Sequence, residues 1–316
     1  MPGSVTSVFS EREDYEAALR EEGCLGLLVT DSGQFRARLT QVRLHRLRLS
    51  AVEEQLSRIA FVAVPTDLIL VSLPIGNRPA PIWSGITLRG DEIMTLGPGE
   101  RAHARTDGPS RSGSIWLPAQ DLARYGRALT GAAFAIPSAA RSWRSPRAAG
   151  RELHQLHRAG TRMAESRPET LVGAEAAHGL EQQLIHALIE CLSAGSADEG
   201  TPAARRHQDI VVRFEALFKS QPERNFRVAE ICTALGVSEP TLRSLCAEHL
   251  GMSPTSYLRL RRMSLVYRTL WRGDPDAASV SEAARRYGFR HLGRFAASYR
   301  ALFGELPSAT LRRGFR

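Results

Sequence analysis

Short runs that are either apolar or alternate between apolar and polar residues occur between Cys24 and Leu117, and this is the pattern of β-strands. Turn residues such as Asp31-Ser32-Gly33 and Gly97-Pro98-Gly99 separate the runs. Many short strands at this spacing are typical of an antiparallel sandwich or barrel. The runs are Phe35–Leu39, Val42–Leu49, Phe61–Val64, Leu68–Leu73, Ile86–Leu88, Ile93–Leu96 and Ser114–Leu117.

The apolar period becomes helical after residue 117, over residues 118–129 and again from about 146 to 192. The last of these segments carries one apolar stripe, formed by Leu180, Leu184, Ile185, Leu188 and Leu192. A helix packed on its own domain explains such a stripe, and so does a dimer seam.

Residues 193–204 are small, polar and without pattern, which predicts a linker. The domain before it would cover residues 1–195, β-rich over 24–117 and helical over 118–192. The domain after it would cover residues 205–316 and consist of helices only, beginning with a helix around Arg205–Ser220.

A helix-turn-helix pattern occurs twice in this second domain. Val228, Glu230, Cys232 and Gly236 are each followed 52 positions later by Val280, Glu282, Ala284 and Gly288. After the turn the offset is 53, and it relates Leu242, Cys246, Gly251 and Pro254 to Phe295, Tyr299, Gly304 and Pro307. A long helix, Pro254–Trp271, is predicted between the two copies. Such a pair can place two recognition helices in successive major grooves of DNA.

In the first copy, a helix is predicted over Val228–Leu235 and a second over Glu239–His249. Gly236 permits the positive φ that the turn requires, and Ser238 is a suitable N-cap. Leu242, Leu245 and Cys246 would face the core. The residues expected to face DNA are Ser238, Glu239, Thr241, Arg243 and Ser244. Among these, Arg243 is the candidate for base reading, because a guanidinium can pair with O6 and N7 of guanine.

In the second copy, Ser279-Val280-Ser281-Glu282 has capping-box spacing, and the turn is Gly288-Phe289-Arg290. The second helix is predicted over His291–Phe303, with Phe295, Tyr299 and Phe303 in the core. Its polar and basic residues, which we expect to bind DNA, are Arg290, His291, Arg294 and Arg300. Most of these contacts would go to phosphates, and Arg294 is a candidate for a base contact.

Charge follows the same division. Residues 203–316 contain 20 Arg or Lys against 10 Asp or Glu, whereas residues 1–202 contain 22 against 23. The whole excess of the net charge, +9, therefore lies on the segment with the repeat. A basic face is required for phosphate neutralisation on DNA, although a merely solvated face would have the same composition.

The C-terminal segment resembles the DNA-binding domain of the AraC/XylS family of transcription regulators. The resemblance covers about the last 105 residues, and its most specific part is Tyr287-Gly288-Phe289 followed by Arg294-Phe295 and Phe303-Gly304-Glu305-Leu306-Pro307-Ser308. The first copy departs from the family pattern at Pro240, Ser244 and Cys246.

The resemblance implies an α+β protein in which an N-terminal cupin-like β-barrel with helices senses an effector and dimerises. We expect a cytoplasmic, nucleoid-associated activator. Its partners would be double-stranded promoter DNA, RNA polymerase, an unidentified small-molecule effector and a second copy of the chain. No apolar run approaches the roughly 18 residues needed to cross a membrane.

The four cysteines form no CxxC pair and have no metal-like spacing with histidine. We expect them to be reduced and mostly buried thiols. They are Cys24, Cys191, Cys232 and Cys246.

Two other functions compete with this one. A cupin-type enzyme needs converging histidines and a carboxylate, but His45 and His103 are isolated in sequence, and a solvated helix face explains the spacing of His154 and His157. GxSxG, HExxH and P-loop motifs are absent, so no catalytic residue, cofactor or metal is expected. A nonspecific architectural DNA-binding protein would also need basic helices, but would not need a separate near-neutral domain.

Overall fold

The computed structural model describes all residues except 1, 77, 199–200, 276–277 and 315–316. By its internal contacts the chain divides into two units. Unit 1 comprises Met1–Gly26 and Arg36–Pro202, and unit 2 comprises Leu27–Phe35 and Ala203–Arg316. The division at Pro202 lies inside the predicted linker, whereas the grouping of Leu27–Phe35 with the C-terminal helices differs from the predicted boundaries.

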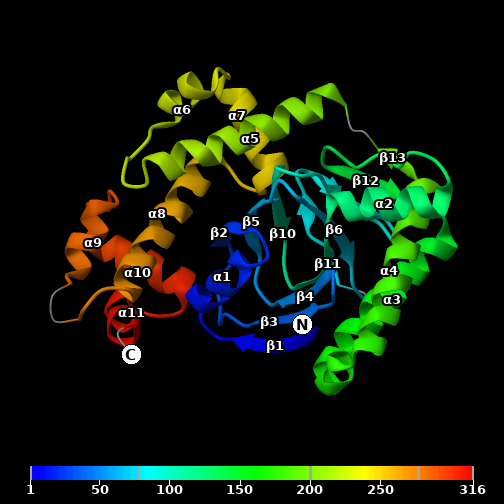
Figure 1. The fold of residues 1–316 in the computed structure, drawn as a ribbon. Coiled ribbons are helices and arrows are strands. Elements are labelled where there is room, and N and C mark those ends of the chain that lie inside the picture. The colour runs from blue at the N-terminus through cyan, green and yellow to red at the C-terminus, as the bar shows by residue number, and fades with distance from the viewer. Residues whose placement is uncertain (1, 77, 199–200, 276–277, 315–316) are drawn as a thin grey trace. The chain divides into compact units, whose positions relative to one another are not determined.

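Two antiparallel sheets form the β-rich part of the chain, which belongs to unit 1 except for the end of one strand from Leu27 onward (Figure 1). The larger sheet has the spatial order β1 (Gly3–Phe9), β3 (Ala37–Arg43), β4 (Arg48–Glu54), β11 (Ser110–Pro118), β6 (Leu68–Pro74), β9 (Ile93–Leu96), β12 (Arg141–Arg144) and β13 (Ser196–Asp198). The smaller sheet has the order β2 (Cys24–Val29), β5 (Arg58–Ala63), β10 (Arg101–Thr106), β7 (Ile82–Trp83) and β8 (Ile86–Thr87).

The predicted α+β fold class is confirmed, with the strands arranged as a cupin-like jelly roll of two sheets and not as a closed barrel. The alternation in the sequence determines which side chains point inward. In β3, for example, Leu39 is buried, whereas its neighbour Arg38 is exposed. Strand β1 and helix α1 (Arg12–Arg20) lie before the predicted β-rich region.

The other described helices of unit 1 are α2 (Ala119–Thr130), α3 (Arg147–Ser166) and α4 (Ala174–Ser193), with a 3-10 turn over Pro168–Val172 before α4. The apolar stripe of α4, from Leu180 to Leu192, is buried in the same core as Val71 and Ile115 of the larger sheet. The stripe therefore packs on its own domain, and the dimer seam is not needed to explain it.

The predicted linker contains regular secondary structure. Ser196–Asp198 forms β13, which pairs antiparallel with β12. Residues 199–200 lie outside the described part, and helix α5 begins at Pro202. Strands β12 and β13 were not predicted, because three or four residues of mixed polarity carry no readable period.

Helices make up the described part of unit 2, apart from the segment Leu27–Phe35. They are α5 (Pro202–Ser220), α6 (Val228–Leu235), α7 (Glu239–Leu245), a π-helical turn η2 (Cys246–Leu250), α8 (Pro254–Trp271), α9 (Val280–Arg286), α10 (Leu292–Phe303) and α11 (Pro307–Gly314). Helices α6 and α8 have the predicted bounds. Figure 1 shows α6 and α7 near one end of α8, with α9, α10 and α11 around its other end.

None of the described helices is both long enough and apolar enough to cross a membrane.

Candidate nucleic-acid interface

The turn of the first helix-turn-helix motif is determined by two residues, Gly236 and Ser238. Gly236 ends α6 in the left-handed region at φ +68°, where a residue without Cβ is favoured. Ser238 then caps α7, because its Oγ accepts a hydrogen bond from the backbone N–H of Thr241 at 3.2 Å. Both features were predicted from the sequence, and they determine the direction in which α7 leaves the turn.

Helix α7 has one buried and one exposed face. Leu242, Leu245 and Cys246 are buried, as expected. All the residues predicted to face DNA from this motif are exposed: Ser238, Glu239, Thr241, Arg243 and Ser244.

Arg243, the base-reading candidate, already has an acidic partner. Its Nη2 donates to Oε1 of Glu239, one turn earlier, at 2.9 Å. The two side chains are 67% and 57% exposed, so the pair is a surface ion pair in high dielectric. Pairs of this kind contribute about 0.3–0.5 kcal/mol to helix stability. Arg243 can therefore leave Glu239 for another acceptor at little cost.

The second motif repeats this construction with different residues. Ser279 Oγ accepts from the backbone N–H of Glu282 and caps α9, and Gly288 adopts φ +84° in the turn. Helix α10 begins at Leu292, one residue later than predicted, because His291 has extended backbone angles and serves as the N-cap.

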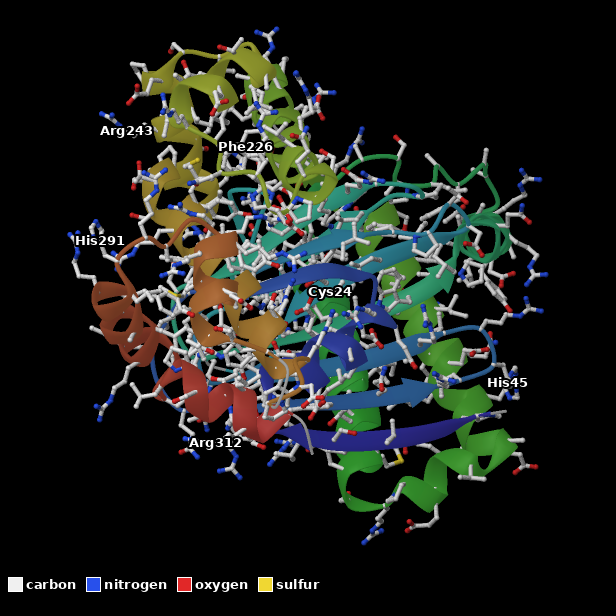
Figure 2. The ribbon with its side chains drawn as sticks, turned by 90° about the vertical axis from the view of Figure 1, so that its left-hand side faces the viewer. Cys24, His45, Phe226, Arg243, His291 and Arg312 are labelled. Atoms are coloured by element: carbon white, nitrogen blue, oxygen red, sulfur yellow. The ribbon has the colours of Figure 1, made fainter. Side chains whose placement is uncertain are left out.

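The basic face of α10 is open to solvent. Phe295 and Tyr299 are buried, while Phe303 is only half-buried although the sequence placed it in the core. All the residues predicted to bind DNA from this motif are exposed: Arg290, His291, Arg294 and Arg300. In Figure 2, Arg243 and His291 project outward on the same side of the view.

A buried polar network fastens α8 to α5. Tyr257 donates from its hydroxyl to Oε2 of Glu215 at 2.7 Å, and Arg261 Nη1 lies 2.9 and 3.0 Å from the two oxygens of the same carboxylate. Burial, reinforced by the charge of Glu215, raises the pKa of Tyr257 well above its usual range, so the phenol stays a donor. The helix that separates the two motifs is therefore held by charge-assisted bonds as well as by packing.

Polar contacts also join α8 and the second motif to the loop between α5 and α6, which leads into the first motif. Arg262 Nη1 donates to Oδ1 of Asn225 at 2.8 Å, and Arg286 of α9 pairs with Glu223. Glu223 and Asn225 lie between α5 and α6, whereas Arg286 precedes the second turn. A Cβ on Gly288 would lie 2.7 Å from Nδ2 of Asn225, so the turn of the second motif packs closely against the loop that precedes α6. These contacts were not predicted, because residues 37 and 63 positions apart leave no periodic signal in the sequence.

Unit 1 contains a small cavity of about 70 Å³. Serine hydroxyls, two indoles and two charged groups line part of it. Ser50 Oγ and Trp116 Nε1 both donate to Oε2 of Glu22, at 3.0 and 3.1 Å, and Arg58 pairs with Glu54 at 3.0 Å. The lining residues are Leu19, Glu22, Cys24, Ser50, Val52, Arg58, Ala60, Val62, Leu70, Ser72, Trp83, Ala104, Ser112, Gly113, Ser114 and Trp116.

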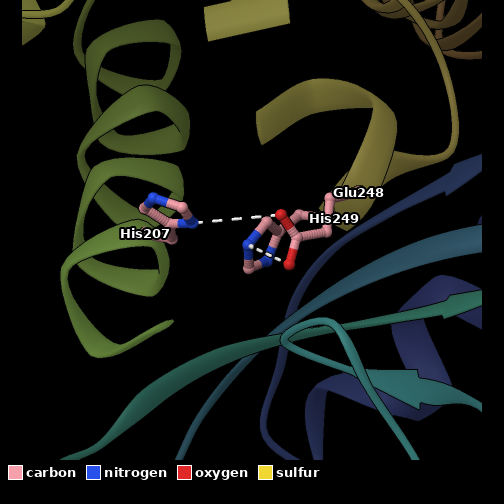
Figure 3. A group of neighbouring side chains, drawn as sticks. All are labelled: His207, Glu248 and His249. Atoms are coloured by element: carbon pink, nitrogen blue, oxygen red, sulfur yellow. Dashed lines mark ion pairs between the residues drawn. The ribbon is translucent and has the colours of Figure 1, made fainter. Parts of the chain in front are cut away.

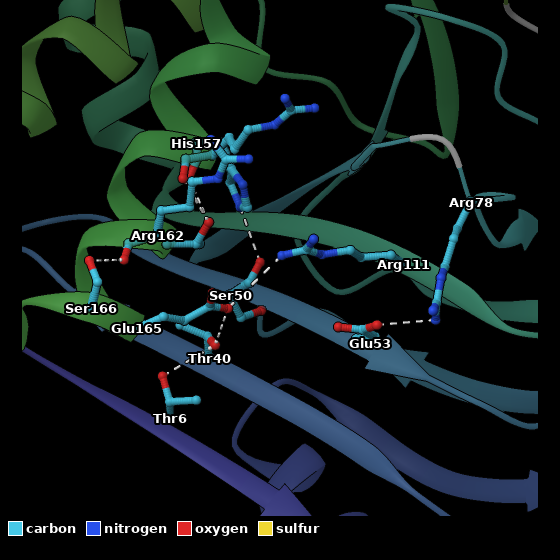
Figure 4. A network of polar contacts seen from close by, with 12 residues as sticks. Thr6, Thr40, Ser50, Glu53, Arg78, Arg111, His157, Arg162, Glu165 and Ser166 are labelled. Carbon is cyan, nitrogen blue, oxygen red and sulfur yellow. Dashed lines mark hydrogen bonds and ion pairs between the residues drawn. The ribbon is translucent and has the colours of Figure 1, made fainter.

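His157 contacts the backbone of two residues that line this cavity, Ser50 and Ser114. The prediction that it lies on a solvated helix face was wrong. The side chain is fully buried, and its Nε2 lies 3.1 Å from the carbonyl oxygen of Ser50 and 3.2 Å from that of Ser114 (Figure 4). Burial lowers its pKa to about 4, so the imidazole is neutral at pH 7 and donates to one carbonyl at a time. Its helical spacing gave no sign that this face of α3 packs on the sheet.

The thiols are consistent with the structural role that the sequence predicted. All four cysteines are free, and Cys24, Cys191 and Cys246 are buried. Burial raises the pKa of Cys246 to about 12 and that of Cys24 to about 11. Both thiols are therefore protonated and unreactive at neutral pH.

Comparison with known proteins agrees with the geometry of unit 2. The family described as "Helix-turn-helix domain" matches residues 231–313. The XylDLEGF operon transcriptional activator 2 of Pseudomonas putida is 32% identical over 142 residues, which cover 45% of this chain and 86% of that protein. The XylDLEGF operon transcriptional activator 3 of the same species is 37% identical over 131 residues, covering 42% of this chain. That match spans only 38% of the length of activator 3.

Among solved structures, the AraC-like transcriptional activator CuxR is similar over 84% of this chain and 96% of its own, with 14% identity and a TM-score of 0.45. Sequence similarity over most of one relative's length, together with two helix-turn-helix motifs that expose polar second helices, identifies the family. The chain belongs to the AraC/XylS family of DNA-binding transcription regulators.

Proposed function

We propose that the protein activates transcription by binding a promoter through α7 and α10 together, in response to a small molecule bound in unit 1. The observation that carries this proposal is the pair of exposed polar helix faces on one fastened scaffold. The two helices would enter successive major grooves, about 34 Å apart along the DNA. Activation is supported by the two relatives from Pseudomonas putida, which are both operon transcriptional activators.

In this proposal α10 mainly contacts phosphates, whereas α7 reads a base. Arg294 and Arg300 on α10, and Arg290 in the turn before it, carry exposed guanidinium groups suited to phosphate oxygens. The side chain of its N-cap, His291, accepts no hydrogen bond from the first turn, which leaves those amides for a DNA phosphate. On α7, Arg243 would exchange Glu239 for a guanine edge, while Thr241 and Ser244 contact the neighbouring backbone.

The test is selection of bound fragments from a random duplex library by the full-length protein, followed by titration of the selected site against scrambled DNA. A site-specific regulator should prefer its site by roughly 10³-fold or more. The selected sequence should span two adjacent grooves.

Arg294→Ala should weaken binding to every duplex and reduce the slope of log K against log salt by about 1. Arg127→Ala is the matched control, because Arg127 is also exposed but lies on α2 of unit 1. If both variants had the same DNA affinity and the same salt dependence, Arg294 would not be part of the DNA interface. Salt-sensitive binding without any enriched sequence would instead indicate a nonspecific architectural protein.

The cavity of unit 1 is the proposed effector site, since residues of both sheets line it and it carries indole, hydroxyl and charged groups. At about 70 Å³ it holds few atoms, so the ligand must be small or must displace side chains. Ala60→Leu should fill the cavity. A compound that raises the melting temperature of the wild-type protein should fail to do so with this variant, and an unchanged shift would place the compound elsewhere.

We also propose that the active species is a homodimer that contacts RNA polymerase on the promoter. The α4 stripe does not supply the dimer contact, because it is buried in its own core. Sedimentation of the full-length protein with and without the selected DNA tests the assembly, and a monomer under both conditions would contradict it.

A further inference from the structure

Three side chains of types that can ligate a metal converge within unit 2, and none of them is among the residues predicted to contact DNA. His207 lies on α5, whereas Glu248 and His249 lie on the π-helical turn η2 that continues α7 (Figure 3). One donor atom from each of the three lies within 4.8 Å of the others. His207 Nδ1 is 3.9 Å from Oε2 of Glu248, and His249 Nε2 is 4.0 Å from its Oε1.

The π-helical turn helps two consecutive residues, Glu248 and His249, to point toward the same cluster. In an α-helix, consecutive side chains diverge by about 100°. A π-helical turn contains more residues per turn, so Glu248 and His249 diverge less. The rings of His207 and His249 stand nearly perpendicular, at 76° with centroids 6.3 Å apart, and Glu248 lies beside both. Such π-helical turns are frequent at functional sites.

From this geometry we propose that His207, Glu248 and His249 form a binding site for a divalent transition metal of the Zn²⁺ class. Two imidazole nitrogens and one carboxylate oxygen are a donor set that Zn²⁺ accepts, with a fourth position left for water. Metal bonds of about 2.0–2.2 Å bring donors to about 3.4 Å from one another around a tetrahedral ion. The atoms must therefore close in by at most about 1.4 Å, which the partly exposed side chains of His207 and Glu248 permit.

The bound ion would connect two elements that the DNA-binding surface depends on. Helix α5 carries the Glu215 carboxylate that holds α8, and η2 is the direct continuation of the first recognition helix. A metal shared by both would fix the end of α7 relative to α5. This site departs from the expectation of no metal, which rested on sequence spacing. His207 and His249 lie 42 positions apart and match no known motif.

Equilibrium dialysis of metal-free, full-length protein against Zn²⁺ at pH 7.5 tests the proposal. One equivalent should bind per chain, and both His207→Gln and Glu248→Gln should lower the affinity by 10-fold or more. His186→Gln is the matched control, since His186 and Glu190 also lie 4.0 Å apart with half-exposed side chains, but on one helix and with no third ligand among the described residues. His186→Gln should bind Zn²⁺ as the wild type does.

Replacement by Co²⁺ gives a readout that is independent of DNA binding. A tetrahedral site of nitrogen and oxygen donors should give visible d–d bands without a sulfur-to-metal charge-transfer band, and Glu248→Gln should abolish or shift them. A charge-transfer band would place the ion on cysteine and overturn the proposal. Absence of Zn²⁺ binding, unchanged affinity in both variants, or an equal loss in His186→Gln would overturn it as well. Glu248 is more than half exposed, so its variant keeps the test valid if His207→Gln fails to fold.

Discussion

A single guanidinium, that of Arg243, has one acidic partner in the structure, Glu239, and a guanine base as its proposed partner on DNA. In the DNA-free protein it is paired with Glu239, and both side chains stand in solvent. A weak exposed pair orients the arginine without holding it firmly. This arrangement suits a residue that must choose between acceptors on DNA.

Arg243→Ala should therefore reduce discrimination between the selected site and single-base variants at one position by about 1–3 kcal/mol, because a bidentate guanine contact is lost. Competition titrations with a set of point-substituted duplexes measure this. Glu239→Gln is the companion variant, which should retain discrimination while binding all duplexes more tightly. An equal loss on selected and scrambled DNA after Arg243→Ala would instead identify a phosphate contact.

The two turn glycines should respond differently to a methyl group. Gly236 and Gly288 both have positive φ, which costs an alanine roughly 1–2 kcal/mol. Among the described residues, a Cβ meets nothing within 4 Å at Gly236, but lies 2.7 Å from Asn225 at Gly288. Gly288→Ala should therefore lower the free energy of unfolding more than Gly236→Ala, by an additional amount of about 1–3 kcal/mol. Urea titrations followed by circular dichroism compare them, and equal losses would show that Asn225 moves aside freely.

Residues whose role depends on near neighbours were predictable. Gly236 and Ser238 were recognised because turn and cap chemistry is local to a few positions. Glu223 and Asn225 were not, because their partners Arg286 and Arg262 are brought to them only by the fold.

At the scale of elements, α7 and α8 both begin with a serine N-cap, so the effect of losing the cap can be compared between them. Ser238 and Ser253 each accept from the N–H three residues later at 3.2 Å, but α7 is a 7-residue helix and α8 an 18-residue helix. Loss of either cap should cost about 1 kcal/mol of stability.

Ser238→Ala should also weaken DNA binding, because a short helix depends more on its first turn and α7 carries the proposed reading residues. Ser253→Ala should leave DNA binding unchanged. Denaturation and titration of both variants test this, and equal effects of the two on DNA affinity would argue that the α7 cap has no special part in recognition.

Element boundaries could be predicted where caps and glycines mark them, as at α6 and α8. The prediction failed at η2, where the helix predicted to end at His249 widens into a π-helical turn. It failed also at β1, β12 and β13, whose short segments become strands only because a neighbouring strand pairs with them.

At the scale of the whole molecule, buried His157 makes the stability of unit 1 depend on pH. Its pKa is about 4 in the folded state against about 6.5 unfolded, so protonation favours unfolding. Its contribution to stability is complete above about pH 6.5 and is lost progressively as the pH falls toward 4.

Between pH 7 and pH 5 the wild type should therefore lose about 2 kcal/mol more of its free energy of unfolding than His157→Gln. Urea denaturation at the two pH values measures the difference, which is independent of any constant destabilisation by the substitution. Parallel pH dependence in the two proteins would show that His157 is protonated without cost in the folded state.

The charge asymmetry, the α+β class and the double motif were visible in the sequence, since each is a property of long segments. The cavity and the His207, Glu248 and His249 cluster were not, because both are made of side chains from several distant elements.

The contacts of Arg262 with Asn225 and of Arg286 with Glu223 have a consequence for the genome that the protein regulates. In the proposed mode of binding, one base pair inserted between the two grooves would turn one of them by about 34° and move it by about 3.4 Å. The second motif could follow only by breaking these contacts, which would lower the affinity for the altered site. Binding sites for this protein should therefore diverge over evolution by base substitution, while selection removes insertions and deletions between the half-sites.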